Sequence, residues 1–487
     1  MLARRIAAVV LAALVAAPVA AQSSGPRPSG GDPTTALLES VPLVFGASRF
    51  DQLATEAPAS VTVISADDIA GRGWRTLGDA LQMVRGFYVT DDGLYPTVGA
   101  RAFGRPGDYN SRLLLIIDGH RINDYLYDAF GPGFEGILDI ADIDRIEIIR
   151  GPSSSLYGNS AFFGVINVFT VRGRSLGGVR ARVAAESFGT REATLSVGGR
   201  TTRGLDVYVS GTVRRSDGRD FFFADFDTSA AGGWARGLDG TARDRATARL
   251  AWNGLTITAM ANQRRKDYAT ARYLVDYGVP GNSVRDRQMF IGATYERSLA
   301  QGATARAQFS LNHTGYEGRY IYGGERNADF LDAYWLVGEG QLTRPLGTRH
   351  RAVFGAQSTV PLKAAQGTRD AVDGAFFNDV RQVLGAVYAQ DEVRVGTNWI
   401  LSGGVRVDYA GTFGVNVSPR LGVIRDLGAG SALKLLYGTA FRAPNNFERF
   451  YNAFDFTPNP NVRPERVHTT ELLLEQRVHT RAKLSAS

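Results

Sequence analysis

From about residue 177 onward, apolar and polar positions alternate along segments of about ten residues. In ATARAQFSLNH (303–313), alanine, phenylalanine and leucine occupy every second position, and polar residues lie between them. The segments RATARLAWN (245–253), WILSGGVRVDY (399–409) and ALKLLYGTAFR (432–442) show the same alternation. Because successive side chains of a strand point to opposite faces, the pattern predicts about fourteen two-faced strands, joined by turns that are alternately short and long.

Two architectures are compatible with such strands. In a soluble sandwich the apolar faces form the interior, whereas in an outer-membrane barrel they face lipid. The polar faces here carry several charges, and Trp252, Trp399 and Tyr409 lie near strand ends, where barrels place their aromatic girdles. The pattern therefore favours a transmembrane antiparallel β-barrel over a sandwich.

The first residues are typical of a secretory signal peptide. Arg4 and Arg5 precede an apolar run, and the small residues VAA (19–21) precede Gln22. A membrane-anchoring helix is the alternative, but the run is shorter than the ~20 residues that a span needs. We therefore expect a signal peptide at residues 1–21, export, and an N-terminal periplasmic segment at residues 22–52 that begins with a disordered Ser/Gly/Pro-rich stretch.

Residues 53–172 show the pattern of a small α/β unit. SVTVIS (60–65) predicts a strand, and Ser65 is a suitable N-cap for a short helix that Gly71 would end. Apolar residues at helical spacing predict a second helix from about Thr76, with Gly86 as its stop. RLLLIIDGHRIND (112–124) and IDRIEIIRG (143–151) predict two further strands, the first followed by an Asp-Gly turn.

Composition limits the kinds of binding site and catalytic site that the chain can form. The chain has 487 residues and 57 glycines but no cysteine, which excludes disulfides and cysteine-ligated zinc. The formal net charge of +7 is spread along the chain without the Lys/Arg stripe of nucleic-acid binders, so nucleic acid is not an expected partner. The five histidines show no metal-ligand spacing, and GPGFEG (131–136) reads as a turn because it lacks the strand and helix of a dinucleotide site. No catalytic set, cofactor or metal is predicted.

Four motifs in order give the chain a resemblance to the TonB-dependent outer-membrane receptors. IEIIRGPSSSLYGNSAFFGVINVFT (146–170) resembles the plug signature of that family over its whole length. VGARAFG (98–104) and LLIIDGHRIND (114–124) resemble two further plug motifs, and YGTAFRAPNNFE (437–448) with NPNVRPE (459–465) resembles a pair of barrel motifs. The resemblance implies a transmembrane β-barrel, of about 22 strands in the intact family, of which residues 177–487 form a part, with an α/β plug domain at 53–172 in its lumen.

The resemblance also assigns roles to residues. The plug-motif residues are Arg101, Asp118, Gly119, Glu147, Arg150, Gly151, Pro152, Gly158, Gly164 and Asn167, and the barrel-motif residues are Phe441, Arg442, Ala443, Pro444, Asn459, Pro460, Glu465 and Glu471. In the family, plug arginines pair with wall carboxylates. We therefore expect Arg101 and Arg150 to pair with Glu471 and Glu448, the alternative being that either arginine is a solvated lumen residue. Losing one partner of a buried pair costs ~3–5 kcal/mol, so such pairs would latch the plug.

Receptors of this family carry an N-terminal box that adds as a strand to the periplasmic protein TonB. ESVPLVFGASRF (39–50) lies at the right distance before the plug, so the candidate box is Glu39, Ser40, Val41, Pro42, Leu43 and Val44. A plain linker is the alternative, and Pro42 departs from the pattern because it lacks a backbone donor. The implied partners are the TonB energy-transducing complex, the barrel-assembly machinery, outer-membrane lipid and lipopolysaccharide, and a small-molecule ligand.

The implied function is energy-coupled uptake of a scarce ligand through the outer membrane of a Gram-negative bacterium. A ferric siderophore is the default by family frequency, with cobalamin or another metal chelate or nutrient as alternatives.

RSDGRDFFFADFD (215–227) predicts a solvated or ligand-contacting extracellular loop, with calcium binding as a weaker alternative. NNFERFYNAFDFTP (445–458) contains no histidine, which counts against haem. Three other functions are disfavoured. A signal-transducing receptor would need a further periplasmic domain, and an enzyme would need a catalytic set. A passive porin would have no plug.

The strand count departs from the family pattern. About fourteen predicted strands fall short of the about 22 that the resemblance implies, and the chain ends at RAKLSAS (481–487) without the terminal aromatic residue usual in the family. We expect either a truncated receptor, which would be non-functional alone, or a smaller barrel, because an open sheet edge in lipid leaves backbone groups unsatisfied.

Overall fold

The computed structural model describes residues 42–104, 108–229, 231–370, 374–453, 456–479 and 482–487. The predicted signal peptide and the candidate box residues Glu39, Ser40 and Val41 lie outside these ranges. Within the described ranges, no helix is both long enough and apolar enough to cross a membrane.

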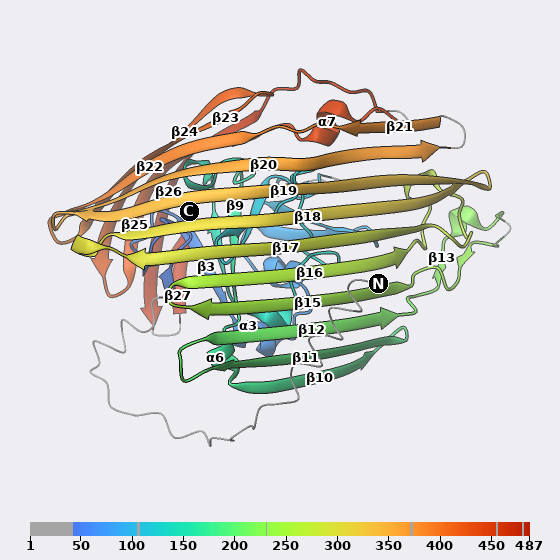
Figure 1. Ribbon diagram of the computed structural model, residues 1–487, viewed down its shortest axis with the longest axis horizontal. Coiled ribbons are helices and arrows are strands. Elements are labelled where there is room, and N and C mark those ends of the chain that lie inside the picture. The colour runs from blue at the N-terminus through green and yellow to red at the C-terminus, as the bar shows by residue number, and fades with distance from the viewer. Residues whose placement is uncertain (1–41, 105–107, 230, 371–373, 454–455, 480–481) are drawn as a thin grey trace.

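The largest element is an antiparallel sheet of 16 strands, here called the wall (Figure 1). Its strands follow one another in chain order from β10 to β27, and the short β21 pairs beside β20. The count exceeds the predicted fourteen or so because strands as short as β21 and β27 do not show a period of two. The bounds are β10 Gly178–Glu186, β11 Thr190–Arg200, β12 Asp206–Ser216, β15 Thr241–Trp252, β16 Leu255–Asp267, β17 Ser283–Ser298, β18 Thr304–Tyr322, β19 Glu325–Leu346, β20 His350–Asp370, β21 Gly374–Asp379, β22 Leu384–Val395, β23 Trp399–Ala410, β24 Gly414–Gly428, β25 Ser431–Arg442, β26 Glu465–His479 and β27 Ala482–Ala486.

The turns at one end of the wall are short, whereas the other end carries the long loops together with the short turns 187–189, 323–324 and 411–413, so the predicted alternation of short and long turns holds only in part. Residues 253–254 and 396–398 are turns of the short-turn end, whereas 217–240, 268–282 and 443–464 are loops of the long-loop end. β13 and β21 mark the long-loop end at the right of Figure 1. The short elements between wall strands are β13 Phe221–Phe222, η2 Ala224–Phe226, β14 Trp234–Ala235, η3 Arg272–Leu274, η4 Ala300–Gly302 and α7 Asn446–Phe450.

The wall has the reverse of a soluble sandwich's polarity. In β24, Val417 and Leu421 are 54% and 60% exposed, whereas Asn416 and Ser418 are 3% and 1% exposed. The apolar face therefore points outward and the polar face points toward the enclosed part of the chain. This arrangement is what a lipid-facing sheet requires, and it selects the barrel over the sandwich.

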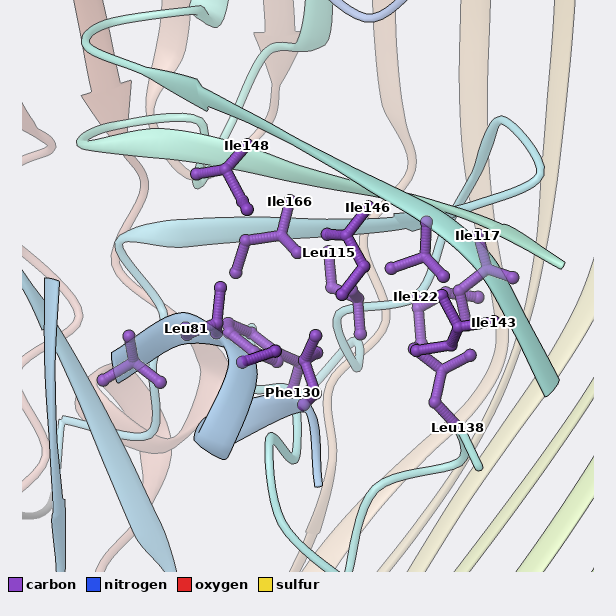
Figure 2. Packing of buried hydrophobic residues seen from close by; sticks show 14 of the residues in the cluster. Leu81, Leu115, Ile117, Ile122, Phe130, Leu138, Ile143, Ile146, Ile148 and Ile166 are labelled. Carbon is purple, nitrogen blue, oxygen red and sulfur yellow. The ribbon is translucent and has the colours of Figure 1, made fainter. Parts of the chain in front are cut away.

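The plug is the α/β unit that precedes the wall. Its sheet has the order β3-β8-β9-β6-β7, in which β6 and β9 are parallel and the other pairs antiparallel. Leu115, Ile117, Ile146 and Ile166 from this sheet pack together with Leu81 (Figure 2). The bounds are β1 Leu43–Val44, β2 Gln52–Leu53, β3 Ser60–Ser65, α3 Ala66–Arg72, α4 Leu77–Gln82, β4 Phe87–Asp91, β5 Pro96–Ala100, β6 Leu113–Ile117, β7 His120–Arg121, η1 Ile140–Asp142, β8 Ile143–Arg150, α5 Ser154–Tyr157, β9 Gly164–Thr170 and α6 Gly173–Leu176.

Capping boxes start the two plug helices. The Ser65 hydroxyl accepts from the Asp68 N–H and the Asp68 carboxylate accepts from the Ser65 N–H, and Thr76 and Asp79 repeat the arrangement. The predicted C-termini were wrong by a few residues. Gly73, with φ of 67°, caps α3 instead of Gly71, and α4 ends before Met83 well short of Gly86. Gly73 adopts the left-handed conformation that a helix end favours, whereas Gly71 continues the helix.

The plug packs directly against the inner face of the wall. Met260 of β16 and Phe290 of β17 belong to the same buried cluster as the plug sheet's central residues. Val353 and Tyr388, from β20 and β22, join a second cluster on the other side of that sheet. The two clusters join the plug to β16, β17, β20 and β22, and Figure 1 shows the plug behind the wall strands.

Candidate functional site

The plug signature and the barrel motif contact each other. The Ser154 hydroxyl accepts from the Phe441 N–H at 3.2 Å, and Asn159 Oδ1 accepts from the Ala443 N–H at 2.7 Å. Gly158 has φ of 73°, and a Cβ there would lie 2.9 Å from the Arg406 guanidinium. The glycine, serine and asparagine residues of the loop therefore let it lie flat against the wall, next to the buried Phe441 and Pro444.

The other plug-motif residues hold the plug sheet together. The Asp118 carboxylate accepts from both the N–H and the hydroxyl of Thr170, and Gly119 has φ of 90° where a Cβ would meet Arg306. The fully buried Glu147 carboxylate accepts from the N–H groups of Phe45 and Gly46 at 3.0 and 2.9 Å. Glu147 thus joins the N-terminal segment to β8.

Two further positions of the signature are constrained by close packing inside the plug sheet. A Cβ on Gly164 would lie 2.6 Å from the Ile149 carbonyl oxygen, so only glycine fits there without a shift of the backbone. Asn167 is 1% exposed and lies in β9 between β6 and β8.

The two plug arginines behave differently. Arg101 Nη2 lies 2.7 Å from Glu471 Oε2, and Gly151, with φ of 100°, lets the chain pass beside this pair. Arg150 instead donates to the Ser60 hydroxyl and, at 3.4 Å, to the Arg85 carbonyl. Pro152 packs against Gly438 of the wall, where an added Cβ would lie 3.2 Å from the proline ring.

A second plug–wall ion pair involves residues that the sequence did not bring together. Arg112, at the start of β6, donates to both oxygens of Glu465 at 2.9 and 2.8 Å. Arg442 bridges Glu465 and Glu448 at 2.6 and 2.9 Å, so Glu448 pairs with a wall arginine and not with Arg150. Glu448, one of the two candidate wall carboxylates, therefore pairs with neither plug arginine, because the Asn445 cap of α7 holds it beside Arg442. Asn459 Oδ1 accepts from the Asn461 N–H, and the Pro460 carbonyl accepts from Arg449.

The N-terminal segment is anchored through its main chain. Pro42 and Leu43 are exposed, whereas Val44 is fully buried and β1 pairs with β2. Lys434 of β25, itself fully buried, donates to the carbonyls of Ala54, Ala57 and Ala59 at 2.8, 2.9 and 3.2 Å. Lys434 also lies 3.0 Å from the Glu475 carboxylate. Arg420 of β24 donates in the same way to the carbonyls of Ala47 and Pro58.

A cavity of about 610 Å³ lies between the plug apex and the long-loop end of the wall. Plug residues 92–97, 109–110 and 124–135 contribute one side, and residues 272–274, 314–331 and 447–456 contribute much of the other. Its lining is rich in aromatic side chains, namely Tyr95, Tyr109, Tyr127, Phe130, Tyr273, Tyr316, Tyr320, Tyr322, Phe330, Phe447, Tyr451 and Phe456. Sequence reasoning did not find this set, because its members are spread over more than three hundred residues. The aspartate- and aromatic-rich loop 215–227 contributes nothing to the lining.

Carboxylates on the plug side of the cavity are shifted by burial. Burial raises the pKa of Asp124 to about 6, although the N–H groups of Leu126, Tyr127 and Ala129 hold its ionised form. Burial also raises the pKa of Glu135, which Arg264 offsets in part. Across the described ranges, no group of three or more His, Cys, Asp or Glu is placed to hold a metal ion.

Two sequence profiles match the chain. The profile described as "TonB dependent receptor-like, beta-barrel" matches residues 184–486, more than half of the chain, and the "TonB-dependent Receptor Plug Domain" profile matches residues 54–165. The iron-regulated outer membrane virulence protein of Vibrio cholerae serotype O1 is 24% identical over 89% of this chain and 65% of its own length. The vitamin B12 transporter BtuB of Vibrio vulnificus is 28% identical over 88% of this chain and 66% of its own length. This chain thus spans about two thirds of the length of these relatives.

Solved structures share the fold. The ferric enterobactin receptor PfeA of Pseudomonas aeruginosa superposes with a TM-score of 0.67 at 17% identity, over 87% of this chain and 70% of the receptor. The ferripyoverdine receptor of the same organism gives a TM-score of 0.68 at 15% identity, over 91% of this chain and 64% of the receptor. At identities this low, the superpositions show that the fold of plug and wall is shared, and they show nothing further.

Proposed function

The chain belongs to the TonB-dependent receptor family, and we propose that it takes up a scarce ligand by energy-coupled transport, with a ferric siderophore as the first candidate. The family is not enzymatic, and its members lie in the outer membrane of Gram-negative bacteria. The observation that carries the proposal is the 610 Å³ cavity, which lies on the far side of the plug from the N-terminal segment. A ligand would bind there, and the plug would have to rearrange before the ligand passed.

The N-terminal segment is the proposed point of coupling to TonB. Pro42 and the exposed Leu43 would extend the candidate box toward TonB, which adds a strand through main-chain hydrogen bonds. Tension on Val44 reaches Phe45 and Gly46, whose N–H groups bind Glu147 in β8. A pull on this segment would therefore load the central sheet of the plug directly, with no covalent chemistry.

A second candidate ligand is cobalamin. The support is the relative described as a vitamin B12 transporter, which is 28% identical over 88% of this chain. Another metal chelate would make the same use of a large aromatic cavity.

Uptake assays in cells that lack other receptors test the proposal. Cells expressing the chain should accumulate a labelled ferric siderophore or cobalamin only when TonB is present and the inner membrane is energised. Leu43→Pro should abolish uptake and leave ligand binding intact, because a proline cannot donate to an added strand. Asp51→Asn, an exposed change in the same segment, is the matched control.

Three results would contradict the proposal, each in favour of a different function. Flux without TonB or energy would indicate a porin. Chemical alteration of the ligand would indicate an enzyme, and a transcriptional response without accumulation would indicate a signalling receptor.

A further inference from the structure

The charges around the cavity are strongly unequal. Among the described lining residues are two arginines, Arg272 and Arg287, and six carboxylates, Asp92, Asp124, Glu135, Asp286, Asp329 and Asp370. Both arginines are already engaged, because Arg272 pairs with Asp92 and Arg287 pairs with Glu317 at 2.5 Å. The lining therefore offers an incoming anion little positive charge.

One buried carboxylate of the cavity lining has an oxygen without a hydrogen-bond partner among the described residues. Glu135 is 6% exposed, and its Oε1 accepts from the Gly133 N–H at 2.9 Å. Its Oε2 has no hydrogen-bond partner within the described part of the chain and forms only a long ion pair with Arg264, at 3.7 Å. Arg264 is held instead by Asp286 at 2.8 Å. A buried acceptor without a partner is costly, and a donor on a ligand would remove that cost.

The backbone of the turn that carries Glu135 is tightly packed, which fixes the position of this residue. It is the GPGFEG segment, where a Cβ on Gly136 would lie 2.0 Å from the Gly131 carbonyl oxygen. Only glycine permits so close an approach of the two chain segments. The turn thus fixes the position of Glu135 in the cavity lining at the plug apex.

The aromatic lining favours the same kind of ligand. Among the residues that the structure describes, eight tyrosines and four phenylalanines line the cavity. The negative faces of such rings attract cations, and their edges and hydroxyl groups accommodate apolar and hydrogen-bonding ligand surfaces. A polyanionic ligand would meet ring faces and carboxylates instead of the arginines that bind anions.

We propose, on the basis of the proposed function, that the cavity binds metal chelates that carry a positive or zero net charge and excludes polyanionic chelates. Glu135 supplies the acceptor for a cationic or N–H group of the ligand, and the tyrosines enclose its apolar part. Binding of a cation also favours the ionised form of Glu135, whose pKa burial raises. A ferric tricatecholate, with three negative charges, is therefore a poor ligand.

Three ferric chelates test the inference on the full chain, purified from outer membranes in detergent. They are a trihydroxamate with a free ammonium group, the same chelate with that amine acetylated, and a tricatecholate. Quenching of aromatic fluorescence gives the Kd of each. The ammonium form should bind most tightly, and the tricatecholate should bind about tenfold or more weakly than the acetylated form, with a gap that narrows at high salt.

Two variants test whether carboxylates of the cavity cause the preference for the ammonium form. Glu135→Gln should reduce the preference for the ammonium form over the acetylated form by about tenfold, since it removes one nearby charge at similar shape. Asp329→Asn should act in the same direction and covers the case in which Glu135→Gln misfolds. Asp67→Asn, an exposed change outside the cavity, should leave the preference unchanged.

The outcomes separate this inference from the proposed function. Tight binding of the tricatecholate, binding of none of the three chelates, or an unchanged preference in both cavity variants would overturn the inference. TonB-dependent uptake of a tricatecholate would overturn it while supporting the proposed function. Charge-selective binding without energy-dependent uptake would support the inference and contradict the function.

Discussion

The two ends of the plug contact the wall in different ways. Near the short-turn end, Lys434 and Arg420 reach in from the wall and donate to carbonyls of residues 47–59, which are main-chain groups. At the long-loop end, the plug apex faces the wall across a cavity of about 610 Å³ that is lined by side chains. The first end is therefore fixed largely through main-chain groups that any sequence supplies, together with the ion pairs Arg49–Glu339 and Glu56–Arg394. The second end is a surface whose chemistry is set residue by residue. Anchoring and recognition are separated along one small domain.

The largest expected effect is at the anchored end. We expect Lys434→Met to lower the free energy of unfolding by about 3–5 kcal/mol, because the buried Glu475 and three carbonyls lose their cation. Urea unfolding in detergent, with hydrogen exchange at residues 54–59, measures the effect. Lys363→Met, at a half-exposed wall lysine paired with Asp332, is the control. Equal losses in the two variants would contradict the comparison, and Lys434→Met with Glu475→Leu should recover part of the loss.

A smaller effect is expected from His120, which lies between the two ends. Burial, reinforced by Arg306 and opposed by Asp118, lowers the pKa of His120 to about 4. Its ring packs against Phe290 and lies 3.0 Å from the Thr294 hydroxyl. Between pH 6.5 and 4 the unfolded chain binds a proton that the folded chain does not, so stability should fall by about 3 kcal/mol as pH drops through this window.

Urea unfolding at several pH values measures the His120 contribution. His120→Gln should flatten the profile in that window. His468→Gln, at an exposed wall position, should leave the profile as it is. A profile that stays steep in His120→Gln would show that another group is responsible.

Gly158 tests how tightly the plug signature lies against the wall. Gly158→Ala should cost about 1–2 kcal/mol, because its φ of 73° is unfavourable for alanine and the new Cβ would press on Arg406. Gly411→Ala, with no atom within 4 Å and no positive φ, should be close to neutral in the same thermal melts. Similar melting temperatures for both variants would show that the loop moves away from the wall at little cost.

The smallest effect is expected at the Arg101–Glu471 pair. The Arg101 side chain is 34% exposed, so solvent screens the pair and a double-mutant cycle with Arg101→Gln and Glu471→Gln should give a coupling of about 1 kcal/mol or less. A coupling as large as the Lys434 effect would reverse the contrast between main-chain and side-chain anchoring.

Local patterns predicted much of the fold. The alternation in 303–313 and 399–409 identified wall strands, and Ser65 and Thr76 marked helix starts, because these features depend on neighbours in the sequence. The resemblance implied that the plug arginines pair with wall carboxylates, and Glu471, one of the two candidates, lies 2.7 Å from Arg101. It did not find Arg112 opposite Glu465, because Arg112 is not one of the plug arginines that the resemblance assigns to a wall carboxylate.

The cavity could not be predicted from the sequence, because its lining residues lie far apart along the chain. Its lining combines plug loops with residues of two wall loops and of the strands β17, β18, β19 and β20, and no single stretch carries its signal. GPGFEG was correctly interpreted as a turn, but its role in presenting Glu135 depends on the wall that it faces. The motifs therefore predicted the plug and the wall, whereas the cavity became apparent only from the tertiary structure.

The contacts of Lys434 have a consequence for sequence divergence. Every amino acid offers the same carbonyl, so positions 54–59 can change without a compensating change at 434. Arg101 and Glu471, whose contact joins two side chains, must change together to keep it. An alignment of close homologues should therefore show covariation between 101 and 471 and little between 434 and 54–59, although the latter contact is the stronger.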